Sequence, residues 1–343
     1  MSIAATITTK KIPKEFIWRR IHSLTGLWFL LFLIEHLFTN SQAALFFGDN
    51  GAWFVRSVNF LHNLPYLQVI ELVLIGVPIA IHAIWGVYYA VTSKSNAFRG
   101  NSGAKPKLAH GRNRAYSYQR LSSWVILVGI ILHVLQMRFL DYPHKYNLGK
   151  TPMYYSKLTV DPGLYPVSDR LDVKLYDSKS ITREKNSLSQ FEYKIAMVQN
   201  RLKEVQLEIA NKGESLEYSS ELDNIYHSLQ KYESKREHIR GLESHILFPG
   251  QVVAVSKNFG NLVLLGVRET FQSVVMCIFY SIFVLASVFH GFNGLWSFLV
   301  SWGVILSRKS HGKTATICIG LMFLVGFLGF MSIWGTYFIN LKH

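Results

Sequence analysis

Five long apolar stretches constrain this chain more than any other feature of its sequence. They run roughly over residues 18–38, 66–91, 121–140, 267–300 and 314–339. Each reaches or approaches the ~20 residues that a helix needs to cross the hydrocarbon core of a bilayer. Half of the 343 residues are apolar and 14% are aromatic, which is typical of a polytopic membrane protein. The sequence therefore predicts an all-α membrane protein with five transmembrane helices.

The basic residues are distributed in a way that indicates membrane topology. They gather in the N-terminal arm, in the loop between the second and third spans, and in the loop between the fourth and fifth. The short loop at 39–65, on the opposite side, has only Arg56. Because basic loops stay in the cytoplasm, we expect a cytoplasmic N-terminus and an extracytoplasmic C-terminus. Basic loops beside the membrane are enough to explain the net charge of +15, so no nucleic-acid partner is expected.

The segment at 141–266 differs from the rest of the chain and divides it into regions 1–140, 141–266 and 267–343. It holds 16 of the 21 acidic residues, so we expect it to leave the membrane on the extracytoplasmic side. Its apolar residues recur at alternating steps of three and four in two runs, 188–209 and 218–239, separated by a helix stop at 211–213. This spacing predicts an antiparallel helical hairpin of the coiled-coil kind. Such a hairpin is either a self-packed insertion or a docking arm for a partner.

Four histidines lie inside four different apolar stretches: His36, His82, His133 and His290. An ionisable side chain is costly in hydrocarbon and is by default a candidate for a functional site. Four imidazoles are the number needed to hold two haems by bis-histidine ligation, with the haem irons as the bound metal. The alternative is that each imidazole makes an interhelical hydrogen bond, which explains one such histidine more easily than four.

The depth of each histidine in its span predicts how the four would pair. With a rise of ~1.5 Å per residue, His36 lies about 24 Å beyond Arg20 and His133 lies about 20 Å beyond Arg120, so both are towards the outer face. Spans two and four run in the opposite direction, and the same count places His82 and His290 in the inner half. We therefore predict an outer haem between His36 and His133 and an inner haem between His82 and His290.

The remaining chemistry is narrowed by what the sequence lacks. It has two cysteines, Cys277 and Cys318, each alone in an apolar stretch. It contains no Cys-x-x-Cys-His motif for covalent haem attachment and no Gly-x-Gly-x-x-Gly fingerprint of a dinucleotide fold. The haems are therefore expected to be non-covalent b haems. The chain can relay electrons, whereas hydride chemistry on a soluble substrate is expected to belong to another subunit.

Several short motifs resemble the cytochrome b subunits of bacterial succinate dehydrogenase and fumarate reductase in their five-helix, di-haem form. They are FIWRRIHSLTG at 16–26, IEH at 34–36, IHAIWG at 81–86, LHV at 132–134, FHGFNGLWS at 289–297 and WG at 302–303. The resemblance implies the four haem ligands paired as their depths suggest. It also implies an anchor in the bacterial cytoplasmic membrane for a flavoprotein and an iron–sulfur protein on the cytoplasmic face, with a menaquinone or other quinone near the outer haem.

Some residues are candidates for secondary roles. His22, with Arg19, Arg20 and Ser23, lies at the cytoplasmic mouth, where it would contact a haem propionate, contact a quinone or simply be solvated. Glu71, near the outer end of span two, is a candidate proton acceptor for a quinol, although capping a helix or pairing with Arg138 would also explain it. His62 is a lower-ranked quinone candidate.

Two departures limit what the resemblance carries over. The family joins spans three and four by a short loop, so the role of 141–266 is open. Some di-haem fumarate reductases have a glutamate two residues before the span-four ligand, where this chain has Val288. Two alternatives remain: the cytochrome b subunit of another quinone-linked dehydrogenase, or a haem-free transporter or structural membrane protein.

Overall fold

The computed structural model describes residues 12–44, 51–92, 111–213 and 216–342, and over these ranges the protein is mostly helical. Within them, five helices are long and apolar enough to cross a membrane, which confirms the five expected spans. They are Lys14–Ala44, Leu67–Thr92, Arg114–Leu140, Val274–Ser301 and Lys309–Ile339. The arm at 1–11 and the loop at 93–110, which carry six of the expected cytoplasmic basic residues, lie outside the described residues.

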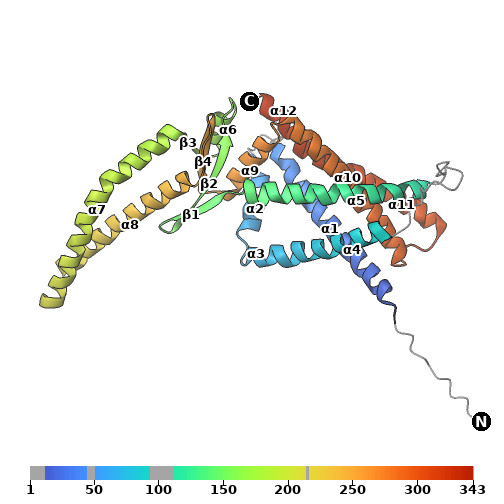
Figure 1. Cartoon of the computed structure of the whole chain (residues 1–343), viewed down its shortest axis with the longest axis horizontal. Helices are drawn as coiled ribbons and strands as arrows, with labels where there is room; N and C mark the ends of the chain where they lie inside the picture. Colours follow the sequence, from blue (N-terminus) through green and yellow to red (C-terminus); the bar gives the residue numbers. More distant parts are fainter. Residues whose placement is uncertain (1–11, 45–50, 93–110, 214–215, 343) are drawn as a thin grey trace, which may run out of the picture. The chain divides into compact units, whose positions relative to one another are not determined.

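The chain divides into two compact units (Figure 1). The first, which we call the helix unit, comprises Met1–Ser41, Leu64–Leu132 and Cys277–Ile333. The second, which we call the sheet unit, comprises Gln42–Asn63, His133–Met276 and Trp334–His343.

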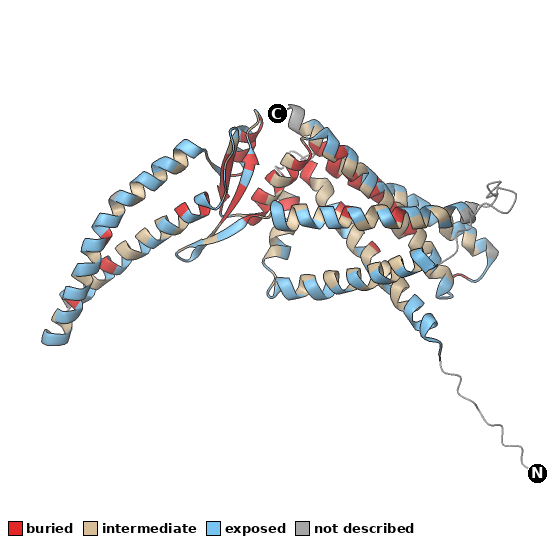
Figure 2. Ribbon diagram, viewed as in Figure 1, coloured by how far each residue is buried: buried red, intermediate tan, exposed pale blue. Residues whose placement is uncertain are grey.

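The helix unit is built from the membrane spans. Helix α1 (Lys14–Ser41) packs against both α4 (Val77–Thr92) and α11 (Arg308–Phe330). Its remaining spans are formed by α5 (Gly111–Val134) and α10 (Val274–Ser301). Most apolar side chains of α4 are half-buried or exposed, which suits a helix whose surface faces lipid (Figure 2).

Two spans differ in detail from a plain helix. The second begins with α3 (Leu67–Ile70), passes through a π-helical stretch, η2 (Glu71–Gly76), and continues as α4. The fourth begins at Val274 rather than near 267, because α9 (Phe259–Thr270) ends first and belongs to the sheet unit. Between α9 and α10, Gln272 donates to Asp161 and Ser273 accepts from the Met276 backbone N–H, so polar contacts separate the two helices.

The third and fifth spans also contain a π-helical stretch. The third continues from α5 into η3 (Leu135–Leu140), and the fifth continues from α11 into η4 (Met331–Gly335) and α12 (Thr336–Lys342). A short 3-10 turn, η1 (Gln42–Ala44), follows α1.

The sheet unit contains a four-stranded antiparallel sheet that the sequence did not lead us to expect. Its strands are β1 (His144–Leu148), β2 (Thr151–Thr159), β3 (Lys174–Tyr176) and β4 (Gln251–Ser256), in the order β1-β2-β4-β3. Five of the six β4 residues are buried, because helices cover both faces of this central strand.

Different helices cover the two faces of the sheet. On one face, Tyr155, Val253 and Val255 form a core with Leu242, near the end of α8 (Leu216–Glu243). Helix α9 packs on β2 and β4 and is itself contacted by α2 (Ala52–His62). A short helix, α6 (Leu164–Arg170), follows β2. Gly260 of α9 lies so close to the backbone of Val55 that a Cβ there would approach its carbonyl oxygen to 2.8 Å.

The long insertion in the sheet unit is the pair α7 (Ser178–Lys212) and α8. They run antiparallel, since Lys185 pairs with Glu243 at one end and Arg201 pairs with Glu221 at the other. The expected apolar seam faces the partner helix: Ile195, Val205, Ile225 and Ile239 are all buried, while the outer faces are exposed (Figure 2). Gly213, with a φ of 83°, ends α7 at the predicted helix stop.

Candidate functional site

The helix unit brings together two of the histidines that the sequence predicts as ligands. His82 of α4 and His290 of α10 have ring centres 6.2 Å apart, with the ring planes at 79°. Two imidazoles bound to opposite sides of one metal ion, each at ~2.0 Å, have ring centres roughly 6 Å apart. The spacing therefore suits a shared iron.

The Nδ1 atom of His82 is held by helix α1. It lies 3.0 Å from the carbonyl oxygen of His22 and 3.3 Å from the hydroxyl of Thr25. A carbonyl only accepts, so Nδ1 of His82 carries the proton. The unprotonated nitrogen is then Nε2, which is the form in which histidine binds a metal.

The Nδ1 atom of His290 is held in the same way by helix α5. It lies 3.3 Å from the carbonyl oxygen of Gln119 and 3.3 Å from the hydroxyl of Ser122. The Gln119 side chain also donates to the His290 carbonyl at 3.1 Å and accepts from Asn293 at 2.7 Å, which ties α5 to α10 at this level. His290 is thus also protonated at Nδ1 and available at Nε2.

Helix α1 also fixes the backbone of the turn that precedes His82. Pro78 has no N–H, so the carbonyl of Leu74 loses its usual partner four residues on. The indole N–H of Trp28 donates to this carbonyl at 2.6 Å. Two residues earlier on α1, Gly26 has no side chain, and a Cβ there would approach the His82 ring to 2.8 Å. Four α1 residues, His22, Thr25, Gly26 and Trp28, therefore determine the position of His82.

His22 is a third imidazole at this site. Its ring stacks on that of His82, with centres 4.1 Å apart and planes at 11°, and its edge meets Tyr89. Its buried Nδ1 is one of few side-chain polar atoms in the described ranges for which no hydrogen-bond partner is present. A buried imidazole nitrogen without a partner fits a contact with a polar group of a bound cofactor.

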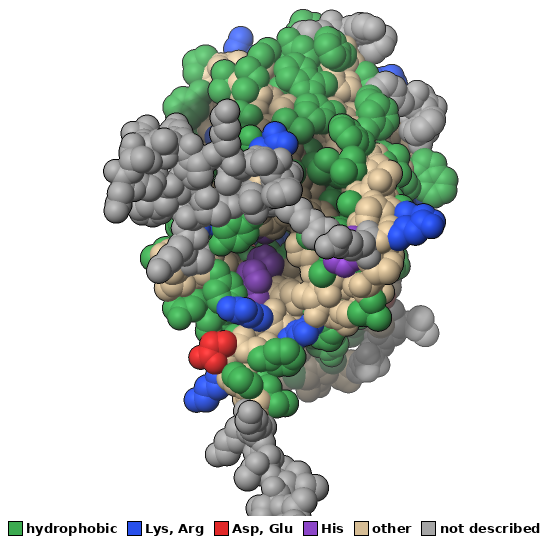
Figure 3. Space-filling view, turned by 90° about the vertical axis from the view of Figure 1, so that its right-hand side faces the viewer, with side chains coloured by type: hydrophobic (Ala, Val, Ile, Leu, Met, Phe, Trp, Pro, Cys, Tyr) green, Lys and Arg blue, Asp and Glu red, His purple; other side chains and the backbone are tan. Residues whose placement is uncertain are grey.

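The other residues predicted at the inner mouth have contacts within the chain. Arg20 donates to the Ser301 carbonyl at 2.6 Å and lies over the Trp302 ring, while the Trp302 indole donates to Ser23 at 2.9 Å. Arg19 is exposed. Figure 3 shows histidine side chains at this end of the helix unit with lysine and arginine side chains beside them. Arg20 and Ser23 thus join the N-terminal end of α1 to the C-terminal end of α10.

The other predicted ligand pair is divided between the units. His36 lies in the helix unit, where its ring stacks on Phe32 with centres 5.5 Å apart and Asn40 donates to its carbonyl. His133 lies in the sheet unit, next to the last residue of α5. The pairing of His36 with His133 stays a prediction.

The two quinone candidates have different surroundings. Glu71 is half-buried at the first position of η2. His62 stacks on Phe259 with ring centres 3.7 Å apart, and its two nitrogens contact the hydroxyls of Tyr154 at 3.1 Å and Tyr142 at 3.4 Å. These contacts give His62 a structural role in the sheet unit.

Sequence reasoning missed the residues that hold the imidazoles: Thr25, Gln119 and Ser122. The sequence did contain a signal for them. Polar residues three positions apart, within or beside an apolar span, are unusual and indicate that their side chains bind something.

Within the described ranges, no group of three or more His, Cys, Asp or Glu side chains converges as a protein-only metal site requires. Two imidazoles with free Nε2 atoms are the ligand set that a haem takes from a protein, since the porphyrin supplies the other four nitrogens. The residues present at His82 and His290 therefore fit a b haem.

Comparison with known proteins supports this interpretation. No family model and no solved structure matches the chain. The succinate dehydrogenase cytochrome b558 subunit of Bacillus subtilis (strain 168) is 34% identical over 126 residues, which are 36% of this chain and 56% of that protein. The match thus covers little more than half of the relative's length. The predicted resemblance is confirmed: this membrane-spanning chain is similar to a cytochrome b subunit of succinate dehydrogenase.

Proposed function

We propose that this chain is the di-haem cytochrome b anchor of a succinate:quinone oxidoreductase. The observation that carries the proposal is the pair His82 and His290, each with Nδ1 bound to a carbonyl of a neighbouring helix and Nε2 available. The similarity to a succinate dehydrogenase cytochrome b558 subunit supports it independently.

In this proposal His82 and His290 bind the inner b haem, and His36 and His133 bind the outer one. When bound, the two haems relay electrons one at a time across the bilayer. His22 would place its buried Nδ1 against a polar edge of the inner haem, such as a propionate. Arg20 and Ser23 would hold the inner ends of α1 and α10 in register around it.

The electron partners are proposed on the same grounds. Succinate would be oxidised by a flavoprotein, and an iron–sulfur subunit on the cytoplasmic face would pass the electrons to the inner haem. Menaquinone or another quinone would be reduced near the outer haem, with Glu71 as the candidate proton-exchanging group. Moving one charge across the membrane couples to its potential by ~2.3 kcal/mol per 100 mV.

The proposed orientation places the N-terminus and the basic loops in the cytoplasm of a bacterium. The C-terminus and the 141–266 segment would then lie outside the cytoplasmic membrane. The basic residues at the inner ends of the described spans, such as Arg20, Arg120 and Lys313, follow this arrangement.

The test is purification of the intact complex in mild detergent, with pyridine haemochrome measured per polypeptide. We expect two b haems and two soluble subunits, a flavoprotein and an iron–sulfur protein. A different soluble partner would indicate another quinone-linked dehydrogenase. A colourless preparation, or one haem instead of two, would overturn the proposal.

Double substitutions test how the histidines pair. His82→Ala and His290→Ala should each lower the content from two haems to one, and the H82A/H290A double variant should lose no more than either single variant. H82A/H133A should lose both haems. His227→Ala, an exposed histidine of α8, is the matched control and should keep both. Loss of both haems in H82A/H290A together with retention of one in H82A/H133A would show a different pairing.

A further inference from the structure

The two imidazoles of the inner site are held by the same arrangement, taken from two different helices. In each case one residue offers its carbonyl oxygen to Nδ1, and the residue three positions later offers a hydroxyl to the same nitrogen. The pairs are His22 with Thr25 on α1 and Gln119 with Ser122 on α5. We call each pair a carbonyl–hydroxyl bracket.

The hydroxyl of each bracket has its own proton engaged. Thr25 Oγ1 lies 3.0 Å from the His22 carbonyl, and Ser122 Oγ lies 3.0 Å from the Gln119 carbonyl, so each can donate back to its own helix. A hydroxyl that donates to its own helix presents lone pairs to its other neighbours. Towards the imidazole, Thr25 and Ser122 therefore act as acceptors, and each Nδ1–H faces two acceptors.

We infer that Thr25 and Ser122 are positioning residues that tune the reduction potential of the inner haem through His82 and His290. This inference rests on the proposed function. Acceptors on the far nitrogen of a ligating imidazole raise its basicity and fix its tautomer and orientation. A more basic imidazole stabilises ferric over ferrous iron, so the brackets lower the potential of the inner haem.

The two acceptors of a bracket can be separated by mutation. The carbonyl belongs to the backbone and survives any substitution at Thr25 or Ser122, so the tautomer and the haem are retained. Thr25→Val keeps the shape of the side chain and replaces only the hydroxyl by a methyl group, and Ser122→Ala removes the hydroxyl with the loss of a single side-chain oxygen. The effect is thus confined to the share of basicity that the hydroxyl supplies.

The experiment is a redox titration of the intact complex, following the absorbance of each haem. Each variant should favour the ferrous inner haem by about threefold to tenfold, which is a rise of about 28 to 59 mV for a one-electron couple. The double variant T25V/S122A should show the sum of the two shifts. The outer haem should keep its potential, and Thr25→Ser and Ser122→Thr, which retain a hydroxyl, should restore the original value.

The chain offers matched controls for both substitutions. Thr316→Val removes a hydroxyl that bonds its own helix at Gly312, and Ser287→Ala removes one from α10, one turn before His290. Neither should move the inner potential. An unchanged potential in T25V and S122A with two haems bound would overturn the inference and leave the proposed function intact. Loss of the inner haem in Thr25→Ser, which keeps the hydroxyl, would also overturn it, because the side chain would then act through packing.

Discussion

The helix unit and the sheet unit both bury polar and ionisable groups, but they satisfy them differently. In the sheet unit the partners come from the chain itself: the buried guanidinium of Arg268 makes two bonds of 2.7 and 2.6 Å to Asp161. Tyr155, fully buried, contacts Nδ1 of His238 at 2.7 Å. In the helix unit, His82 and His290 are bound at Nδ1 while Nε2 is the atom that would take iron.

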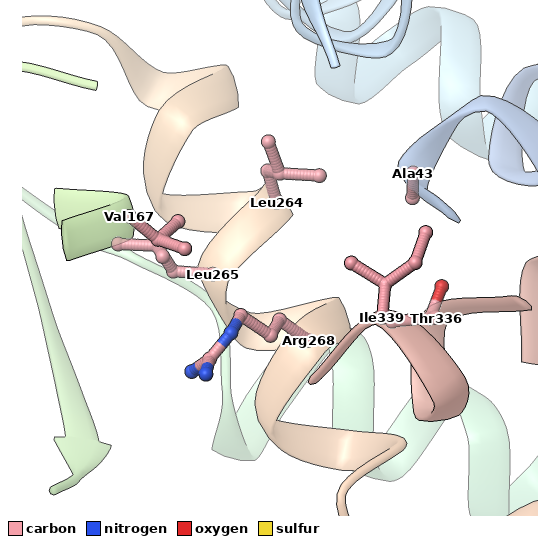
Figure 4. A pocket seen from close by; sticks show the side chains of 7 residues that line it. All are labelled: Ala43, Val167, Leu264, Leu265, Arg268, Thr336 and Ile339. Atoms are coloured by element: carbon pink, nitrogen blue, oxygen red, sulfur yellow. The ribbon is translucent and has the colours of Figure 1, made fainter. Parts of the chain in front are cut away.

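The difference concerns whether the chain itself supplies the partners of its buried polar groups. Figure 4 shows Arg268 extending its guanidinium away from Thr336 and Ile339, which line a cavity of only about 10 Å³. A cavity of this size holds one water at most, so the sheet unit has no room there for a ligand. The helix unit, by contrast, holds two imidazoles whose Nε2 atoms would bind haem iron in the proposed function.

Haem depletion should produce the largest difference in hydrogen-exchange protection between the two units. We expect protein produced without haem synthesis to lose hydrogen-exchange protection in α4 and α10, and to keep it in β2 and β4. A ligand at about 1,000 times its dissociation constant stabilises the folded state by ~4.1 kcal/mol, or about a thousandfold in protection. Hydrogen exchange read by mass spectrometry in detergent measures both units in one sample. Equal loss of protection in strands and spans would show that the units are not independent in this sense.

Breaking the buried ion pair between Arg268 and Asp161 should destabilise the sheet unit and spare the helix unit. Burial raises the pKa of Asp161, but the hydrogen bonds and the charge of Arg268, together with hydrogen bonds from Gln272 and the Gly163 backbone, leave the pKa below its ordinary value. Asp161→Asn leaves the buried Arg268 charge without its counterion, which costs about 3–5 kcal/mol. We expect the sheet unit to unfold at lower denaturant concentration while the inner haem, whose two proposed ligands lie in the helix unit, stays bound.

The matched control for Asp161→Asn is Glu243→Gln, which breaks the pair with Lys185 on the hairpin. Both of those side chains are exposed, at 42% and 63%, so the expected loss of stability is small. If Asp161→Asn removed the inner haem while leaving the strands protected, the separation of roles between the units would be wrong.

The parts of the structure that sequence predicted are those set by periodicity. Apolar length predicted the five spans, and steps of three and four predicted which faces of α7 and α8 meet, down to Ile195 and Ile225. Depth along a helix predicted that His82 and His290 would lie together, because the rise per residue is nearly constant.

The parts that escaped prediction depend on contacts between distant segments. Strand β2 pairs with β4 across about ninety residues that include the hairpin, with Tyr155 opposite Val255. A short apolar run such as 252–255 does not distinguish a strand from a piece of helix. The carbonyl–hydroxyl brackets also escaped prediction. Each depends on how two helices pack, because Thr25 and Ser122 contact histidines of other helices.

Mild acid should produce the smallest and most local difference between the two units, through His245 of the sheet unit. Burial, followed by the nearby His144 and Lys157, lowers the pKa of His245 from its ordinary value to about 4, while the Gly241 backbone raises it. The unfolded chain therefore binds this proton first, so the stability of the sheet unit should fall as pH drops from about 6.5 towards about 4. His245→Gln should flatten that part of the pH dependence, measured as exchange protection at the end of α8.

The spectrum of the inner haem should stay constant over the part of this range in which the sheet unit remains folded, because an imidazole bound to iron is not free to take up a proton. An inner-haem spectrum that changed in parallel with the α8 protection, and that followed His245→Gln, would mean that the sheet unit contributes to the inner haem site.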